Sequence, residues 1–159
     1  FTSADLGYAI GRLCKEEHFL LKTLDGGVSW SAVSRDGLSA APFWGFPLCI
    51  CFLDEHMGWC GDLGGRVFKT LDGGRHWRQE SWYLSDPVVS ISFTAAGIGI
   101  AVSPSGSCWI HEKDSWSQCS KIDIGEDLSI RSISFCPDGR IVSASSRGLL
   151  FLGLAGNEE

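Results

Sequence analysis

The side chains with most chemical potential in this sequence are its cysteines and histidines, and their spacing decides what they can do. Cys108 and His111 are three residues apart, as in many zinc sites, but no second ligand pair follows at a suitable distance. Cys49 and Cys51 alternate along an expected strand, where both thiols face one side. The sequence contains no Gly-x-Ser-x-Gly, His-Glu-x-x-His or Cys-x-x-Cys motif. These patterns predict no catalytic residue, no metal site and no cofactor.

The remaining cysteines and histidines favour structural roles. Seven cysteines are an odd number, so at least one is unpaired or bridges to another chain. Most lie in apolar stretches, which favours reduced, buried thiols and slightly favours a cytoplasmic location. No signal-peptide pattern is visible in the given residues, so the compartment stays open. Four histidines fall in expected turns or strand edges and are predicted to be solvated: His18, His56, His76 and His111.

Composition restricts the class of protein. The chain has 159 residues, of which 44% are hydrophobic and 20% charged, as expected of a folded domain. A formal net charge of −6 disfavours sequence-independent binding to nucleic acid. The longest apolar runs are far shorter than the roughly 20 residues that a membrane span requires. Twenty glycines and abundant aromatic residues indicate short strands joined by turns.

A nine-residue segment occurs twice and reveals an internal repeat. Lys22–Trp30 reads KTLDGGVSW and Lys69–Trp77 reads KTLDGGRHW, so their aspartates stand 47 residues apart. A second element, in which small residues alternate with Ile and Phe, recurs as Cys49–Phe52, Ser90–Phe93 and Ser132–Phe135. Its period of two is typical of a strand with two unlike faces. Repeats of this length predict propeller blades of four strands each.

The repeat divides the chain into four units, at about 1–42, 43–85, 86–127 and 128–159. In the second unit the strands are expected near 48–53, 57–61, 65–70 and 76–82. The first unit lacks its opening strand and the fourth its closing strand. This incompleteness predicts a four-bladed ring closed by the chain ends, a pair of chains that complete each other, or part of a larger propeller. The homodimer is the favoured interpretation, with the 149–152 strand at its seam.

The repeated segment has the residues that a tight turn between two strands requires. An aspartate can accept hydrogen bonds from the following backbone N–H groups, and a threonine hydroxyl can bond to the same loop. A glycine can adopt positive φ, and the tryptophan can fold over the turn. These structural positions are Thr23, Asp25, Gly27 and Trp30 in the first copy, and Thr70, Asp72, Gly74 and Trp77 in the second.

At these positions the sequence resembles the Asp-box (BNR-repeat) propellers. The longer stretch Phe52–Gly65, followed by Lys69–Gly74, is most similar to the Ycf48-type photosystem II assembly and stability factors and their bacterial relatives. The resemblance covers about the first half of the chain. The third unit departs from it, because His111–Trp116 lacks the glycines and is two residues short. The resemblance implies an all-β propeller in which the Asp box is a structural turn rather than a catalytic site.

Asp boxes also occur in sialidases, so a carbohydrate-active propeller is the alternative hypothesis. A sialidase resemblance would require an arginine cluster and a tyrosine nucleophile supported by a glutamate. The chain has only two tyrosines, and Tyr8 aligns with Trp59, a packing position. In a carbohydrate-binding or glycoside-hydrolase-like protein, aromatic loops would stack on sugar rings. The favoured hypothesis is a non-enzymatic module that binds another protein through the face formed by the connections between blades.

The candidate binding residues are aromatic and lie in the connections between units. In a propeller, these connections lie on the face that opens onto the central channel. Phe43, Trp44 and Phe46 precede the second unit, and Trp82 and Tyr83 precede the third. Large aromatic residues in loops are candidate interface anchors, although they can equally cap the gaps between blades. Arg131, at the start of the fourth inner strand, is the charge expected at the channel mouth.

Overall fold

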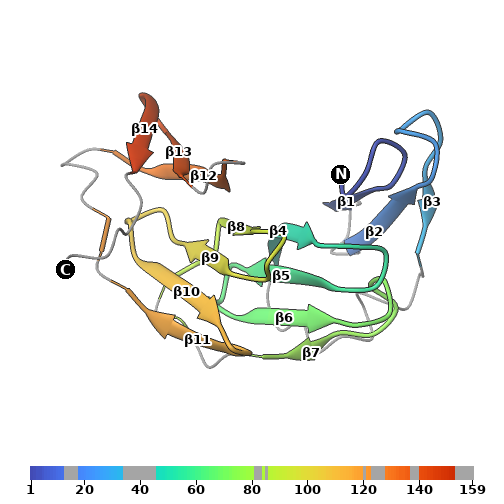
Figure 1. The fold of residues 1–159 in the computed structure, drawn as a ribbon, viewed down its shortest axis with the longest axis horizontal. Coiled ribbons are helices and arrows are strands. Elements are labelled where there is room, and N and C mark those ends of the chain that lie inside the picture. The colour runs from blue at the N-terminus through green and yellow to red at the C-terminus, as the bar shows by residue number, and fades with distance from the viewer. Residues whose placement is uncertain are drawn as a thin grey trace.

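The computed structural model describes residues 1–12, 18–33, 46–80, 84, 86–119, 121–122, 128–136 and 140–152 (Figure 1). For residues 12, 18 and 149–152 only the backbone is described. The described part is built from short antiparallel strands that follow the chain in order. It contains no helix long and apolar enough to cross a membrane.

The strands form four successive sheets, each a simple meander. The first sheet comprises β1 (Gly7–Arg12), β2 (His18–Thr23) and β3 (Ser31–Ala32). The second comprises β4 (Pro47–Phe52), β5 (Gly58–Asp62), β6 (Val67–Thr70) and β7 (Arg78–Gln79). The third comprises β8 (Ser90–Phe93), β9 (Gly99–Val102), β10 (Cys108–Glu112) and β11 (Ser115–Gln118). The fourth comprises β12 (Ile130–Phe135), β13 (Ile141–Ser145) and β14 (Gly148–Leu152).

The four sheets stand side by side in an open arc, with the first and fourth sheets at its two ends (Figure 1). Inner strands of neighbouring sheets contact each other: β1 with β4, β4 with β8, and β8 with β12. The described strands thus form an arc rather than a closed ring (Figure 1), and closure by the chain ends stays a prediction, because residues 153–159 lie outside the described part. The expected seam at 149–152 lies among residues whose side chains are not described, so the homodimer stays a prediction.

Apolar clusters between the sheets hold the arc together. Leu20 of the first sheet packs with Cys60, Phe68 and Trp77 of the second. Between the second and third sheets the core is built around Trp59, Val67, Ile91 and Trp109, and between the third and fourth around Val102 and Ile133. The alternation of small and large residues in the repeated strand therefore serves two interfaces in the second and third sheets, which are covered on both faces.

The two copies of the repeated segment form nearly identical turns. In the first copy the Asp25 carboxylate accepts hydrogen bonds from the Ser29 N–H (2.9 Å) and the Thr23 hydroxyl (2.7 Å). The Trp30 indole N–H donates to the Gly27 carbonyl (3.1 Å). The second copy repeats this pattern, with the His76 N–H bonded to Asp72 (2.9 Å), Thr70 to Asp72 (2.9 Å) and Trp77 to Gly74 (3.0 Å). Gly27 and Gly74 adopt φ of 93° and 88°, which favours glycine.

The cysteines are not all reduced, which corrects the sequence-based expectation. Cys108 and Cys119 form a disulfide, with Cα atoms 5.5 Å apart. The register of the β10–β11 hairpin explains the pairing, since Trp109 lies opposite Gln118 and the Cys119 N–H donates to the Cys108 carbonyl. Of the described cysteines, Cys49, Cys51, Cys60 and Cys136 remain thiols, and burial raises the pKa of Cys49 to about 12. With one pair oxidised, the cysteines no longer favour a reducing compartment.

Candidate functional site

The candidate site is a groove between the second and third sheets, which we call the central groove. Its cavity volume is about 530 Å³. Its walls come from the β4–β5 turn (Leu53, Asp54), the β8–β9 turn (Ala96, Gly97) and the β10–β11 turn (Asp114). In a meander, these turns lie at the same end of the sheets as the Thr-x-Asp-x-Gly-x-x-Trp turns. We call this end the Asp-turn face, and the opposite end the connection face.

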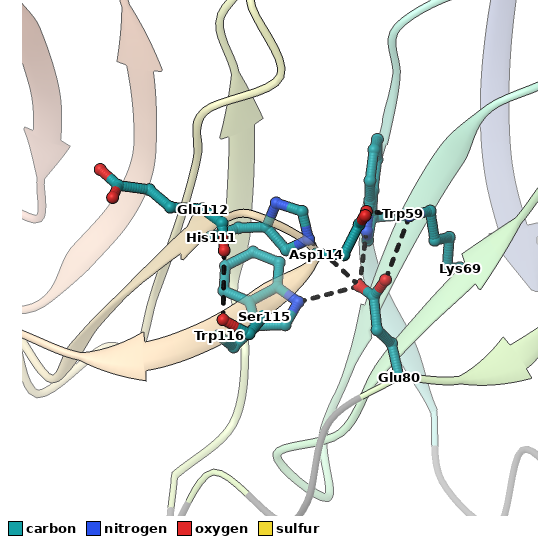
Figure 2. A network of polar contacts seen from close by, with 8 residues as sticks. All are labelled: Trp59, Lys69, Glu80, His111, Glu112, Asp114, Ser115 and Trp116. Atoms are coloured by element: carbon teal, nitrogen blue, oxygen red, sulfur yellow. Dashed lines mark hydrogen bonds and ion pairs between the residues drawn. The ribbon is translucent and has the colours of Figure 1, made fainter.

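A glutamate just beyond β7 ties the two walls of the central groove together (Figure 2). The indole N–H groups of Trp59 and Trp116 both donate to the Glu80 Oε2 atom, at 2.8 and 3.0 Å. The ammonium of Lys69 lies 3.3 Å from the other carboxylate oxygen, Oε1. Trp59 also stacks on Phe93 of the third sheet, with ring centroids 3.8 Å apart. Glu80 therefore fastens two blades by charge-assisted hydrogen bonds.

The imidazole of His111 lines the same groove, and it is buried, which corrects the expectation of a solvated side chain. His111 lies on β10 among Trp59, Phe93 and Trp116, whose rings it meets edge-on at 5.0–5.6 Å. The residue is only 4% exposed. Neither ring nitrogen has a hydrogen-bond partner among the described residues, and Nε2 lies 3.8 Å from Glu80 Oε2. Buried polar atoms without partners are uncommon and call for an explanation.

A two-residue turn places the last charged groups at the groove. Lys113 and Asp114 both have positive φ (49° and 60°), the backbone of a two-residue type I′ hairpin turn, so this turn forms without glycine. The Asp114 carboxylate lies 3.4 Å from the ammonium of Lys69, although the aspartate side chain is 88% exposed. Asp54 is engaged differently: backbone N–H groups of Met57 and His56 donate to it and lower its pKa. The groove thus combines the Lys69 ammonium with two carboxylates, Asp54 and Asp114, and has the buried His111 ring in its wall.

A second, smaller groove lies one blade away on the Asp-turn face, and we call it the lateral groove. Its volume is about 340 Å³, and it lies between the first and second sheets. Lys22, Arg75 and His56 line it, together with Glu55 and Asp72. Tyr8 packs close by, stacked on Phe52 with ring centroids 3.7 Å apart, and its hydroxyl donates to the Glu55 carbonyl (3.0 Å). Burial and the nearby Glu55 carboxylate raise the pKa of Tyr8.

Of the binding residues predicted from the sequence, only Phe46 and Arg131 are described, and neither lines the central or the lateral groove. Phe43, Trp44, Trp82 and Tyr83 lie outside the described residues, so their role stays a prediction. Phe46 is half-buried on the connection face, where its carbonyl accepts the Leu63 N–H (2.8 Å). Arg131 is exposed on β12 at a register irregularity, which matches the position of Leu48 on β4. The carbohydrate hypothesis rests on the same undescribed loops.

Sequence reasoning did not select Lys69 or Glu80, and it predicted a solvated His111, although part of the signal was present. The lysine is the first residue of both copies of the repeated segment, and the strand before it carries an aromatic residue in both units, Tyr8 and Trp59. Glu80 has no counterpart in a local motif, because its partners Trp59 and Trp116 are 21 and 36 residues away. Among the described residues, no group of three potential ligands is placed to hold a metal ion.

Comparison with known proteins identifies the architecture. No family model matches the chain, and no curated protein matches it. Among solved structures, "YCF48 bound to D1 peptide" is 23% identical with a TM-score of 0.59, and the match covers 97% of this chain and 47% of that one. YCF48 from Cyanidioschyzon merolae is 21% identical with a TM-score of 0.62, and the match covers 98% of this chain and 50% of that one. The WD40 beta propeller domain of Doa1 is 12% identical with a TM-score of 0.64, and the match covers 95% of this chain and 51% of that one.

The chain is a partial array of β-propeller blades. The predicted fold class is thereby confirmed, and the four sheets are blades, of which the first and fourth have three described strands. At these identities the likeness shows the fold alone, and the chain spans about half the length of the three structures.

Proposed function

We propose that this chain is a non-enzymatic protein-interaction module that holds a segment of a partner protein in the central groove. The observation that carries the proposal is His111, a nine-tenths buried side chain whose ring nitrogens have no hydrogen-bond partner among the described residues, in the wall of a 530 Å³ groove. Both nitrogens are covered in the unbound structure, so a segment with a polar side chain or main-chain group can satisfy them once neighbouring side chains move. The groove lies between two blades, and its walls are turns that a peptide can span.

The comparisons support the same interpretation. One similar propeller was solved with a peptide bound, as its description "YCF48 bound to D1 peptide" states. Asp-box propellers of that type are the family that the repeated segment resembles, and we extend the protein-binding role from them to this chain. The partner's identity is a separate question, because a propeller scaffold hosts many ligands.

The test selects peptides from a random 12-residue display library on the intact chain and measures their affinity by calorimetry. Replacing Ala96 by Trp fills the central groove from the exposed β8–β9 turn and should weaken binding at least tenfold. The matched control is Leu63→Trp, which adds the same ring at a 48% exposed position on the connection face. If Leu63→Trp abolishes binding and Ala96→Trp does not, the partner uses the connection face and the central groove is wrong. If no peptide is selected, the interaction proposal fails.

A further inference from the structure

The inner edge of the first blade differs from that of the other blades. Strand β1 corresponds to β5 of the second blade, because each pairs with the strand that ends in the repeated Lys-Thr pair. In the second blade β4 lies on the inner side of β5, whereas β1 is an edge strand among the described residues (Figure 1). Phe1 holds the place of the last residue of an inner strand, since its ring covers Gly7 as the ring of Phe52 covers Gly58. The positions beside β1 that lead up to Phe1 therefore form an unpaired sheet edge in the described part of the chain.

The main chain of β1 directs hydrogen-bonding groups to this edge. The Leu20 carbonyl, on β2, accepts the N–H of Val33 at 3.0 Å and so points away from β1. Ile10 lies opposite Leu20, and in an antiparallel ladder its own N–H and C=O then point to the inner edge, as do those of Tyr8 two residues earlier. Neither Tyr8 nor Ile10 has a main-chain hydrogen-bond partner on that side within the described residues. Such an edge is a template for a further strand.

The inner strand of the second blade faces the same edge. Between the third and fourth blades, Ser90 accepts the Ile133 N–H at 3.1 Å and donates to the Ile133 carbonyl at 3.4 Å. Ser92 accepts the next outward N–H of β12, at 3.1 Å. Ile50 occupies on β4 the ladder position of Ile133, but the described part of the first blade offers it no such serine. Ile91 and Ile133 are 6% and 4% exposed, whereas Ile50 is only half-buried.

We propose that the inner edge of β1 binds an extended segment of another polypeptide as an added antiparallel strand, in which two serines flank a branched aliphatic residue. The main chain of the segment bonds to Tyr8 and Ile10. Its first serine bonds to the main chain of Ile50, and its second accepts the N–H of Phe52. The small serine side chains let the segment approach β4 as closely as β8 approaches β12. This strand addition is a recognised mode of peptide binding, and its site is separate from the central groove.

The probe is the peptide acetyl-Ile-Arg-Ser-Ile-Ser-amide, which copies residues 130–134, the five positions that precede Phe135 on β12. It is titrated into the intact chain, and amide hydrogen exchange is followed by NMR. The amides of Tyr8 and Ile10 should exchange at least tenfold more slowly at saturation. The amide of Ala9 is the internal reference, because it faces β2 and should not change. If the exchange of Tyr8 and Ile10 is unaffected, the proposal is wrong.

Methylation of the peptide's main-chain nitrogens provides a matched pair of controls. The N–H groups of its two serines face β1, so methylating them should weaken binding at least tenfold. The N–H of the isoleucine between them faces away from β1, and methylating it should change the affinity less than twofold. Equal effects of the two modifications would overturn strand addition. A peptide with leucine in place of both serines should also bind at least tenfold more weakly, and equal binding would overturn the serine pattern.

A variant chain tests the location. Joining Ile-Arg-Ser-Ile-Ser directly ahead of Phe1 should fill the edge from within the chain, block the free peptide and raise the urea midpoint. The control extension, Ile-Arg-Pro-Ile-Pro, has no N–H groups to donate to β1 at the two positions and should leave peptide binding intact. Undiminished peptide binding to the serine-containing variant would place the peptide elsewhere and contradict the proposal.

Discussion

At the scale of single residues, the aspartates of the repeated turns are charged hydrogen-bond acceptors, so their contribution depends on pH. Hydrogen bonds from the Ser29 hydroxyl and N–H, and then from Thr23, lower the pKa of Asp25 from 3.8 to about 2. A carboxyl with a lowered folded-state pKa stabilises the fold above its unfolded pKa, and that contribution is lost as the pH falls through the folded value. The window for Asp25 therefore runs from about pH 4 to pH 2.

The first prediction follows from this window. Asp25→Asn should flatten the fall in melting temperature between pH 4 and pH 2, because the asparagine has no charge to lose. Thermal unfolding followed by circular dichroism at half-unit pH steps measures the slope. Asp5→Asn is the control, since its carboxylate accepts no hydrogen bond from the described residues. An identical acid slope in Asp25→Asn and the parent chain would contradict the role assigned to this carboxylate.

At the scale of elements, the interface between the second and third blades depends on Glu80. Its side chain is 12% exposed and that of Lys69 is 13% exposed, so neither charge is well solvated. Glu80→Gln keeps one acceptor for the two indole N–H groups but leaves the Lys69 ammonium without its buried partner. We expect a loss of about 2 to 4 kcal/mol in the free energy of unfolding. Urea denaturation measures it, with the exposed Glu112→Gln as control, and an unchanged midpoint would contradict the role of Glu80.

The same elements show what sequence can and cannot predict. Period-two patterns and Gly-containing turns located the strands of the second blade to within about two residues, except that β7 is only Arg78–Gln79. The sequence pattern predicts a longer fourth strand, because Trp77 continues its alternation. In the structure Trp77 instead belongs to the turn, where its indole N–H donates to the Gly74 carbonyl. Glu80 and His111 act across blades, so no local pattern reports their partners. The Cys108–Cys119 pair, in contrast, could have been predicted from the hairpin register.

The two copies of the turn also provide a matched pair for packing. Trp77 is 7% exposed, because the first blade covers it, whereas Trp30 is 39% exposed. Both indoles make the same hydrogen bond, and both meet a phenylalanine edge-on, Phe52 at 6.0 Å and Phe1 at 6.1 Å. Trp77→Ala should cost about 3 to 5 kcal/mol and Trp30→Ala clearly less. Equal losses in urea denaturation would show that the hydrogen bond, rather than the neighbouring blade, determines the effect.

At the scale of the whole molecule, the arc formed by the described residues leaves the outer face of the first blade uncovered (Figure 1). The equivalent face of the second blade carries Phe52, Cys60, Phe68 and Trp77, and the first blade buries it. On the first blade, Phe1 is 73% exposed and Trp30 presents its ring to solvent. Exposed apolar faces of this kind usually mark contacts with other polypeptides. A blade of another copy has the matching shape and chemistry, because the chain already makes this contact internally.

The last prediction is that the chain self-associates at micromolar concentration through this face. Sedimentation equilibrium should give an average mass above that of the monomer, and the mass should rise with concentration. Trp30→Gln should shift the equilibrium towards monomer, since it removes the largest partly buried ring of the face. Leu71→Gln is the control, because Leu71 is 64% exposed in the equivalent turn of the second blade, away from the outer face. A monomer at all concentrations would contradict self-association. An equal effect of the two substitutions would show that general surface hydrophobicity, rather than this blade face, drives it.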